Sequence, residues 1–185
     1  VASSGLLEAA VIDRPERPLA LTLFRATRQT VGTNGEPGGQ MQGELRFRYW
    51  IVPLQGDPDR AGLARLGQML AGGFRAGQVT AKDVAFHRPA HEMPAEASFL
   101  RLKGDAVLTS LRQTVAGLEA RVFNPNPQAV GVEFDLSGWP AGAKTPAAAQ
   151  AVNLESQPVG EPKPLSAGKV RFELDAKKIL TVCFG

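Results

Sequence analysis

The sequence predicts a mainly all-β protein, in which an antiparallel β-sandwich with one short crossover helix is followed by a small immunoglobulin-like β-sandwich. Apolar and polar residues alternate with a period of two in many short segments, as they do in strands that are buried on one face. Twenty glycines and fourteen prolines punctuate the 185 residues. Short strands separated by such turn formers are typical of sandwiches and barrels.

The charge and composition disfavour several classes of function. The net charge is only +3 and the basic residues do not form a run, so we expect no nucleic-acid partner. No apolar segment reaches the roughly 18–20 residues of a membrane span, so we expect no membrane partner. Cys183 has no second cysteine to pair with, which favours a cytoplasmic location. Because the chain begins Val-Ala-Ser-Ser without a charged leader, we expect it to be a piece of a longer polypeptide.

The N-terminal part centres on two alternating strands, residues 17–25 and 43–53, which follow a shorter apolar segment at 6–12. The apolar positions recur at every second residue: Leu19, Leu21 and Leu23, then Leu45, Phe47, Tyr49 and Ile51. Between the two strands, residues 26–42 contain four glycines and one proline. This loop is longer than a hairpin turn, and long loops in compact domains are often functional.

One helix is predicted near residues 58–71. Asp57 is expected to cap its free amides, and Pro58 suits the first helical position. Gly72 and Gly73 are expected to end it. Leucines recur at helical spacing, at Leu63, Leu66 and Leu70. We interpret this stripe as a face packed on a sheet.

The C-terminal part is densely β. Strands are predicted at 98–103, 106–115, 118–123, 130–136, 149–154, 170–174 and 177–184. Asn124-Pro-Asn-Pro127 is predicted to be a turn joining 118–123 to 130–136 as an antiparallel pair. The pattern is that of an immunoglobulin-like sandwich without the cysteine pair of antibody domains. We place the domain boundary near Gly104, with residues 1–103 ending a large sandwich and 104–185 forming a small one.

No catalytic or metal site is predicted within the chain. His87 and His91 are four residues apart, a spacing that suggests zinc on a helix, but Pro89 lies between them and excludes a helix. Cys183 lies on an alternating strand, where a packing role is expected. Glu133 and Asp135 share one strand face opposite the core, as on a solvated sheet surface.

Five pieces of the chain carry a family resemblance. In order they are Gly5-Leu-Leu-Glu8; Arg17-Pro-Leu-Ala-Leu-Thr-Leu-Phe-Arg25 with 39–49; Val52-Pro-Leu-Gln-Gly-Asp57; Pro94-Ala-Glu-Ala-Ser-Phe-Leu100 with 107–111; and Leu118-Glu-Ala-Arg-Val-Phe-Asn-Pro125. Together they resemble the C-terminal region of bacterial α-mannosidases of glycoside hydrolase family 38. Leu7 stands where that family usually has proline, and the loop after Arg28 lacks aspartates found in many members.

The resemblance implies an activity that this chain alone does not carry. Such enzymes hydrolyse terminal α-mannosides with retention, using an aspartate nucleophile and a zinc ion in an N-terminal α/β domain. This chain would then be the non-catalytic region that supports and completes the sugar site. Its implied partners are the N-terminal catalytic domain of the same polypeptide, with its zinc, and a mannose-containing glycan. In the family one sandwich loop approaches the sugar, and its counterpart here places Arg25, Arg28, Asn34 and Glu36 as candidate substrate-proximal residues.

A second class of function stays open, a stand-alone carbohydrate-binding or protein-interaction sandwich. A sugar-binding module is expected to present aromatic side chains that stack on sugar faces. Trp50 and Trp139 are the candidates for that role.

Overall fold

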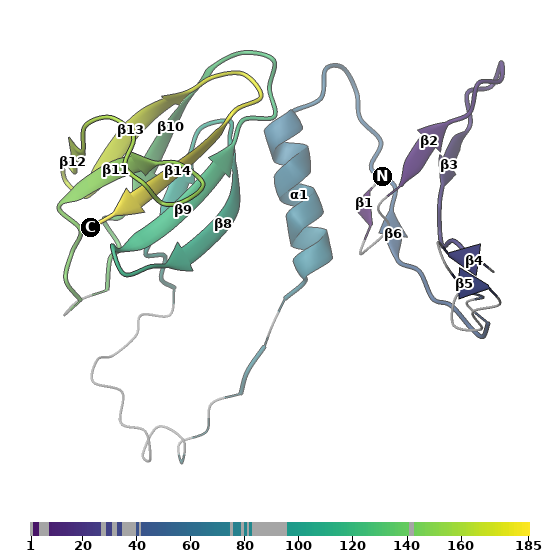
Figure 1. Cartoon of the computed structure of the whole chain (residues 1–185), viewed down its shortest axis with the longest axis horizontal. Helices are drawn as coiled ribbons and strands as arrows, with labels where there is room; N and C mark the ends of the chain where they lie inside the picture. The colour runs from purple at the N-terminus through teal and green to yellow at the C-terminus, as the bar shows by residue number, and fades with distance from the viewer. Residues whose placement is uncertain are drawn as a thin grey trace. The chain divides into compact units, whose positions relative to one another are not determined.

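The computed structural model describes residues 8–26, 40, 42–74, 76–78, 80, 82, 96–140 and 143–185, and the backbone of 2–3, 29–30 and 33–34. Within this part of the chain the fold is mainly β, with fourteen strands and one α-helix (Figure 1). The predicted fold class is therefore confirmed. The chain divides into two compact units. The first comprises residues 1–58 with 66–74, and the second comprises residues 59–65 with 75–185.

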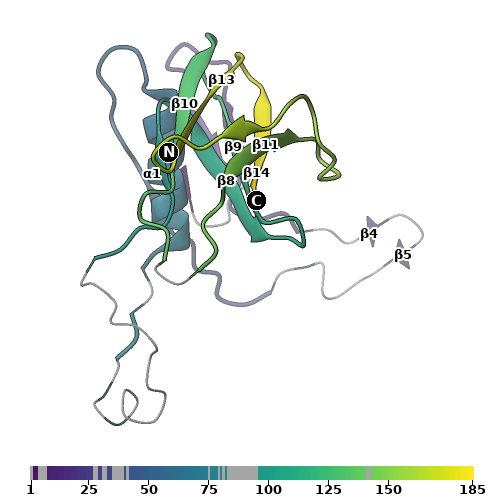
Figure 2. The same ribbon diagram turned by 90° about the vertical axis from the view of Figure 1, so that its left-hand side faces the viewer.

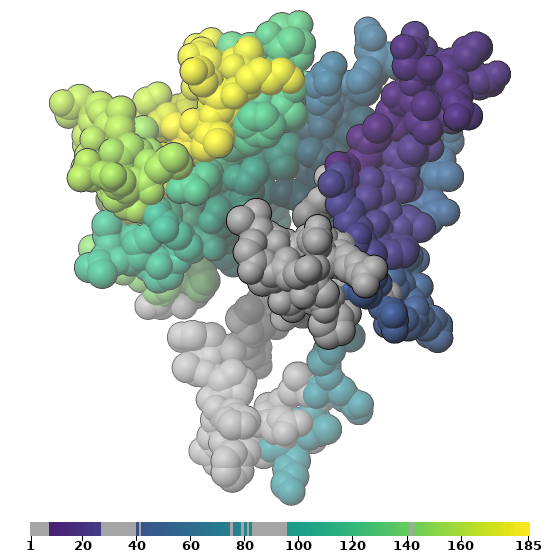
Figure 3. Space-filling view, turned by 45° about the vertical axis from the view of Figure 1, so that its right-hand side comes forward, coloured from purple at the N-terminus to yellow at the C-terminus, as the bar shows by residue number. Residues whose placement is uncertain are grey.

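Among the residues that the structure describes, the first unit contains three two-stranded antiparallel sheets. They pair β2 (Ala9–Val11) with β3 (Leu19–Leu21), β1 (Ala2–Ser3) with β6 (Tyr49–Trp50), and β4 (Gln29–Thr30) with β5 (Thr33–Asn34). Val11 lies opposite Leu19 in the β2–β3 ladder. In these strands the large apolar side chains of Val11, Leu19 and Tyr49 are exposed. Figure 3 shows the N-terminal residues drawn in purple at the surface.

The helix α1 (Arg60–Gly72) begins two residues later than predicted. Asp59 caps it, because its Oδ1 accepts a hydrogen bond from the Gly62 N–H at 2.8 Å. The prediction that Asp57 is the cap was therefore wrong. Gly62 leaves room for this cap, since a Cβ there would lie 2.1 Å from Asp59 Oδ2. At the other end Gly73 has a φ of +62°, the left-handed conformation that ends many helices.

The second unit is a two-sheet antiparallel sandwich, which can be followed in Figures 1 and 2. One sheet has the order β12-β11-β14-β9-β8, and the other β13-β10-β7. The strands are β7 (Arg101–Lys103), β8 (Val107–Gln113), β9 (Leu118–Phe123), β10 (Val130–Asp135), β11 (Ala148–Val152), β12 (Lys163–Pro164), β13 (Lys169–Leu174) and β14 (Ile179–Phe184). Phe134 lies at the centre of the core and meets Phe172 and Phe184 edge-on, at ring distances of 6.1 and 5.4 Å.

The predicted pairing of 118–123 with 130–136 was wrong. Strand β9 pairs with β8 and β14, whereas β10 pairs with β7 and β13. The segment between them crosses from one sheet to the other. Asn124 holds this crossing, because its buried amide donates hydrogen bonds to the carbonyls of Gln128, Leu174 and Asp175.

The sandwich starts before residue 104, where the sequence analysis places the domain boundary. Strand β7 belongs to the three-stranded sheet, since Leu102 lies opposite Phe134 of β10. Gly104 is a closely packed corner inside this unit. Its φ is +108°, and a Cβ there would lie 2.2 Å from the carbonyl oxygen of Gly131. Position 104 therefore requires glycine, because any side chain would collide with the backbone of β10.

Candidate functional site

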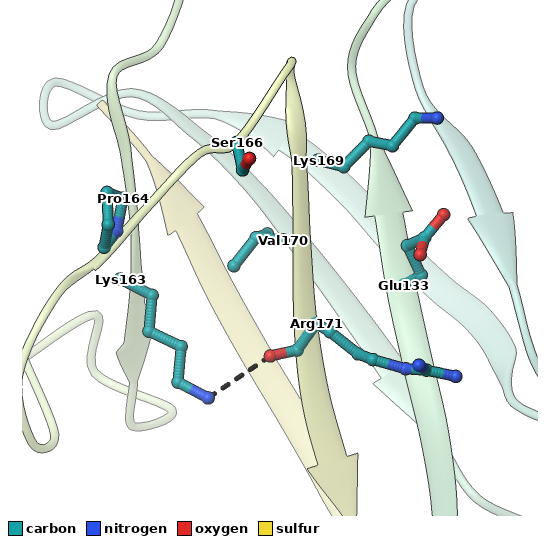
Figure 4. Close-up of a pocket in the computed structure, with 7 residues that line it drawn as sticks. All are labelled: Glu133, Lys163, Pro164, Ser166, Lys169, Val170 and Arg171. Carbon is teal, nitrogen blue, oxygen red and sulfur yellow. Dashed lines mark hydrogen bonds between the residues drawn. The ribbon is translucent and has the colours of Figure 1, made fainter.

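The strands β12 and β13 enclose a hollow that we call the β12–β13 wedge. Its volume is about 430 Å³, and it is lined by Glu133, Lys163, Pro164, Ser166, Lys169, Val170 and Arg171 (Figure 4). A tight turn joins the two strands, and beside it Ser166 and Lys169 exchange two backbone hydrogen bonds of 2.9 Å. Farther from the turn the two strands separate, because β12 pairs with β11 of the other sheet. The wedge is the space between the separated strands.

The turn at the tip of the wedge explains its shape. Ala167 and Gly168 both have positive φ angles, +49° and +73°. Two such residues form the two-residue turn that suits the twist of a hairpin. No site was predicted here from the sequence. The signal was present in this turn and in Pro164, because proline in a strand is confined to edges, first positions and bulges.

Three cationic side chains border the wedge, but they do not converge on one point. Lys163 Nζ donates to the Arg171 carbonyl at 3.2 Å and lies 4.5 Å from the Phe172 ring centroid. Figure 4 shows the Lys163 and Arg171 side chains directed to opposite sides of β13. Lys169 Nζ lies 3.8 Å from an oxygen of Asp135. The three cations therefore do not form a cradle for a single small anion.

Two carboxylates on the outer face of the three-stranded sheet, Glu133 and Asp135, are paired with lysines. Lys103 Nζ lies 3.1 Å from Glu133 Oε1 and 3.7 Å from Asp135 Oδ2. The Glu133 carboxylate raises the pKa of Lys103 above its usual value. The Ser137 hydroxyl and backbone N–H lower the pKa of Asp135. Asp135 is almost fully buried, so the prediction of a solvated face does not hold for this residue.

A row of side chains with polar atoms crosses the other sheet, and its two central members, Glu119 and Cys183, are buried. The strand registers align Arg112, Glu119, Cys183 and Gln150 on β8, β9, β14 and β11. Glu119 is only 2% exposed. Burial by itself raises its pKa, but hydrogen bonds from Ser156 and Arg112 outweigh this and the net pKa is lowered. Burial and the Glu119 charge raise the pKa of Cys183. A protonated, buried thiol is a poor nucleophile.

Of the candidate substrate-proximal residues, Arg25 is the one whose side chain is described. It is exposed and donates two hydrogen bonds, of 3.2 and 2.6 Å, to the carboxylate of Glu8. This pairing raises the pKa of Arg25 and lowers that of Glu8. Asn34 lies in β5, where its backbone pairs with Gln29. The Asn34 side chain, Arg28 and Glu36 lie outside the described residues.

Two further predictions concern metal and aromatic groups. His87 and His91 lie outside the described residues, and no group of three potential metal ligands occurs among the residues that are described. Trp139 packs against the core, meets Phe99 edge-on at 6.0 Å, and donates its indole N–H to the Lys144 carbonyl at 3.2 Å. Trp50 is half-buried in β6.

The fold defines a β-sandwich protein, with a two-sheet antiparallel sandwich in its second unit. Comparison with protein-family models, with curated proteins and with solved structures finds no match to this chain. In the described part of the chain, α1 does not meet the length and apolarity that a membrane-spanning helix requires.

Proposed function

We propose that this chain is the non-catalytic C-terminal β-sandwich region of an α-mannosidase resembling glycoside hydrolase family 38. It supports and completes the sugar site of an N-terminal catalytic domain of the same polypeptide, which holds the zinc and hydrolyses terminal α-mannosides. The ordered resemblance between residues 5 and 125 supports the family. The uncovered apolar surface of the first unit supports the role.

That apolar surface is the observation that carries the proposal. Ile51 is 75% exposed and Val11 is 59% exposed. Large apolar side chains with 40% or more of their surface exposed also occur at Ile12, Leu19, Leu23, Phe24, Tyr49 and Leu54. Isolated two-stranded sheets are marginal in water, and soluble monomers rarely expose extended apolar patches. We infer that further strands of a larger sandwich cover these residues in the complete protein.

The second unit then acts as a rigid support. Its two sheets enclose a continuous core around Phe134, Phe172 and Phe184, which keeps the sandwich folded while the first unit packs on the catalytic domain. The 26–42 loop, with Arg25, Arg28, Asn34 and Glu36, reaches toward the mannose-containing glycan and hydrogen-bonds its hydroxyl groups. The nucleophile and the zinc belong to the catalytic domain.

The rival function, a stand-alone sugar-binding module, has less support. Such a module stacks flat aromatic faces on sugar rings. The Trp139 ring is instead engaged with Phe99 and the core. Phe24 and Phe47, which are both exposed, stack on each other with ring centroids 6.2 Å apart and planes 10° from parallel. Their mutual stacking uses one face of each ring.

The proposal is tested with a chromogenic α-mannoside in the presence of zinc. Hydrolysis is measured for this chain and for the polypeptide encoded together with its upstream reading frame. We expect activity in the longer polypeptide and none in this chain. Activity in this chain alone would overturn the non-catalytic role, and inactivity of both would overturn the mannosidase proposal.

The role of the loop is tested by alanine substitution in the longer polypeptide, at Arg25, Arg28, Asn34 and Glu36. We expect these substitutions to raise KM. Unchanged kinetics would show that the loop does not contact the sugar.

A further inference from the structure

We propose that Glu8 is a specificity-determining residue of the sugar site, which orients Arg25 toward neutral hydroxyl groups and disfavours an anionic substituent, such as a phosphate ester, on the glycan. The inference rests on the proposed function, because it takes Arg25 as a residue that contacts the sugar. It goes further in assigning a role to Glu8 and in selecting uncharged glycans over charged ones.

The Glu8–Arg25 pair joins two segments at one end of the β2–β3 ladder. Glu8 precedes β2, and Arg25 lies 17 residues later, beyond the end of β3. The Thr22 N–H donates to the Glu8 carbonyl at 3.1 Å, which continues the ladder by one residue past the Ala9–Leu21 pair. The backbone of Glu8 is therefore held beside the segment from which Arg25 projects.

Glu8 binds one side of the planar guanidinium group. Arg25 Nε donates to Glu8 Oε2 at 3.2 Å, and Arg25 Nη2 donates to Glu8 Oε1 at 2.6 Å. Two parallel bonds of this kind fix the orientation of a guanidinium group, whereas a single bond would leave it free to rotate. The remaining donors of Arg25 therefore point in a set direction, away from Glu8.

Those remaining donors suit a pair of hydroxyl groups. An arginine side chain has five N–H groups, and Glu8 uses one on Nε and one on Nη2. The two on Nη1 and the second on Nη2 lie at the free end of the group, and the Arg25 side chain is 76% exposed. Donors on two neighbouring nitrogens fit two acceptor oxygens side by side. Hydroxyl groups on adjacent carbons of a sugar ring provide such oxygens.

The Glu8 carboxylate sets the charge preference of this position. Hydrogen bonds from Arg25 and from the Thr22 hydroxyl lower the pKa of Glu8, so the carboxylate is ionised at neutral pH and the pair has no net charge. A phosphate group on the ligand would lie close to this second negative charge, which opposes its binding. An unpaired arginine has the opposite preference, because guanidinium groups bind phosphate with two parallel hydrogen bonds.

The pair can be altered without unfolding the chain. Both side chains are exposed, and exposed ion pairs contribute little to stability. Glu8→Gln removes the charge and keeps the size of the side chain. Glu8→Asp keeps the charge. The effects of these variants can therefore be measured on binding and catalysis.

The first test measures hydrolysis of a chromogenic α-mannoside, with zinc, by the polypeptide encoded together with the upstream reading frame. We expect Glu8→Gln to raise KM about three- to fivefold, the effect of losing an exposed ion pair, with kcat changed by less than about twofold. The control is Asp13→Asn, at the exposed Asp13–Arg17 pair. It is expected to leave KM and kcat unchanged.

The second test uses inorganic phosphate as a competitive inhibitor. We expect Glu8→Gln to lower the inhibition constant of phosphate about fivefold, because Arg25 without its carboxylate partner binds the anion more strongly. Glu8→Asp and Asp13→Asn are expected to leave the inhibition constant unchanged. Binding of phosphate to zinc is common to all these proteins, so the ratio of inhibition constants reports on Arg25.

A double-variant comparison shows whether Glu8 acts through Arg25. In a polypeptide that already carries Arg25→Gln, we expect Glu8→Gln to change neither KM nor the inhibition constant of phosphate further. A merely structural effect of Glu8 would have the same size with and without Arg25.

The outcomes separate this inference from the function on which it rests. Inactivity of the longer polypeptide would overturn the proposed function and the role of Glu8 together. In an active polypeptide, any of three results would overturn the role of Glu8 alone. They are an unchanged KM in Glu8→Gln, phosphate inhibition that Glu8→Gln does not strengthen, and an effect of Glu8→Gln that persists in full without Arg25.

Discussion

Arg112 Nη2 lies 2.6 Å from Glu119 Oε2 on the outer face of the five-stranded sheet, and Arg112 Nε donates to the same oxygen at 2.8 Å. The carboxylate is buried, whereas the arginine is about half exposed. The same guanidinium donates to Ser156 Oγ at 2.7 Å and so fastens the 153–157 turn over the sheet. Glu119 Oε1 has no hydrogen-bond partner among the described residues. The buried charge therefore depends heavily on Arg112.

Removing Arg112 is expected to destabilise the sandwich. Arg112→Ala leaves the buried Glu119 carboxylate without its closest cation, and we expect a loss of about 2–3 kcal/mol in the free energy of unfolding. Urea denaturation monitored by circular dichroism measures it. Arg101→Ala, at an exposed strand arginine, is the control and is expected to change stability by less than about 0.5 kcal/mol. Equal effects of the two substitutions would contradict the importance of the Arg112–Glu119 pair.

Acid is expected to destabilise the second unit through Glu119 and Asp135. Both carboxyl groups have a lowered pKa in the folded chain. A group whose folded pKa is depressed contributes stability that is fully present above its unfolded pKa, about 4. This contribution is lost as the pH falls through the lower, folded pKa. We expect the urea concentration at the unfolding midpoint to decrease as the pH is lowered below about 4. In Asp135→Asn this decrease is expected to be less steep than in the unaltered chain.

Asn124 is expected to matter more than its neighbour Asn126. Asn124→Ala removes a buried amide that donates to three carbonyls and accepts from the Asn126 N–H at 2.9 Å. We expect a loss of roughly 3 kcal/mol, since the carbonyls stay buried and lose their donors. Asn126→Ala removes one side-chain bond, to the Asp105 carbonyl, and is expected to cost about 1 kcal/mol. Thermal unfolding of both variants gives the comparison, and a reversed order would refute the crossing role of Asn124.

Two glycine substitutions are expected to change stability in opposite directions. Gly117 has a φ of +142°, and a Cβ there would lie 2.0 Å from the Phe184 carbonyl oxygen. Gly117→Ala is therefore expected to cost at least about 2 kcal/mol. Gly67 lies within α1 with no atom within 4 Å of an added Cβ, so Gly67→Ala is expected to stabilise the helix by up to about 1 kcal/mol. Circular dichroism melting curves of the two variants provide the measurement.

The helix cap distinguishes two aspartates. Asp59→Ala removes the acceptor of the Gly62 N–H and is expected to lower stability by about 1 kcal/mol. Asp57→Ala, two residues earlier, is expected to have almost no effect. Helical content by circular dichroism and midpoints in urea are the readouts. A larger effect at Asp57 would show that the helix starts where the sequence alone suggests.

Local patterns in the sequence determined the elements and their buried faces. Val132 and Phe134 occupy alternate positions in β10 and are fully buried. Val170 and Phe172 occupy alternate positions in β13 and are almost completely buried. Period-two alternation reports which face of a strand meets the core, and this is a local property. The end of α1 followed likewise from the glycines at 72 and 73. The family resemblance and the loop residues it suggests stay predictions.

Only the tertiary structure decided which strands are neighbours and where the sandwich opens. Strands β9 and β10 are consecutive and alternate well, yet they lie in different sheets. Their separation depends on Asn124 bonding to Leu174, 50 residues further along the chain. The wedge depends on β12 leaving β13 to join β11. Such contacts arise only when distant segments pack together, because alternation describes the burial of a strand and carries no information about its partner.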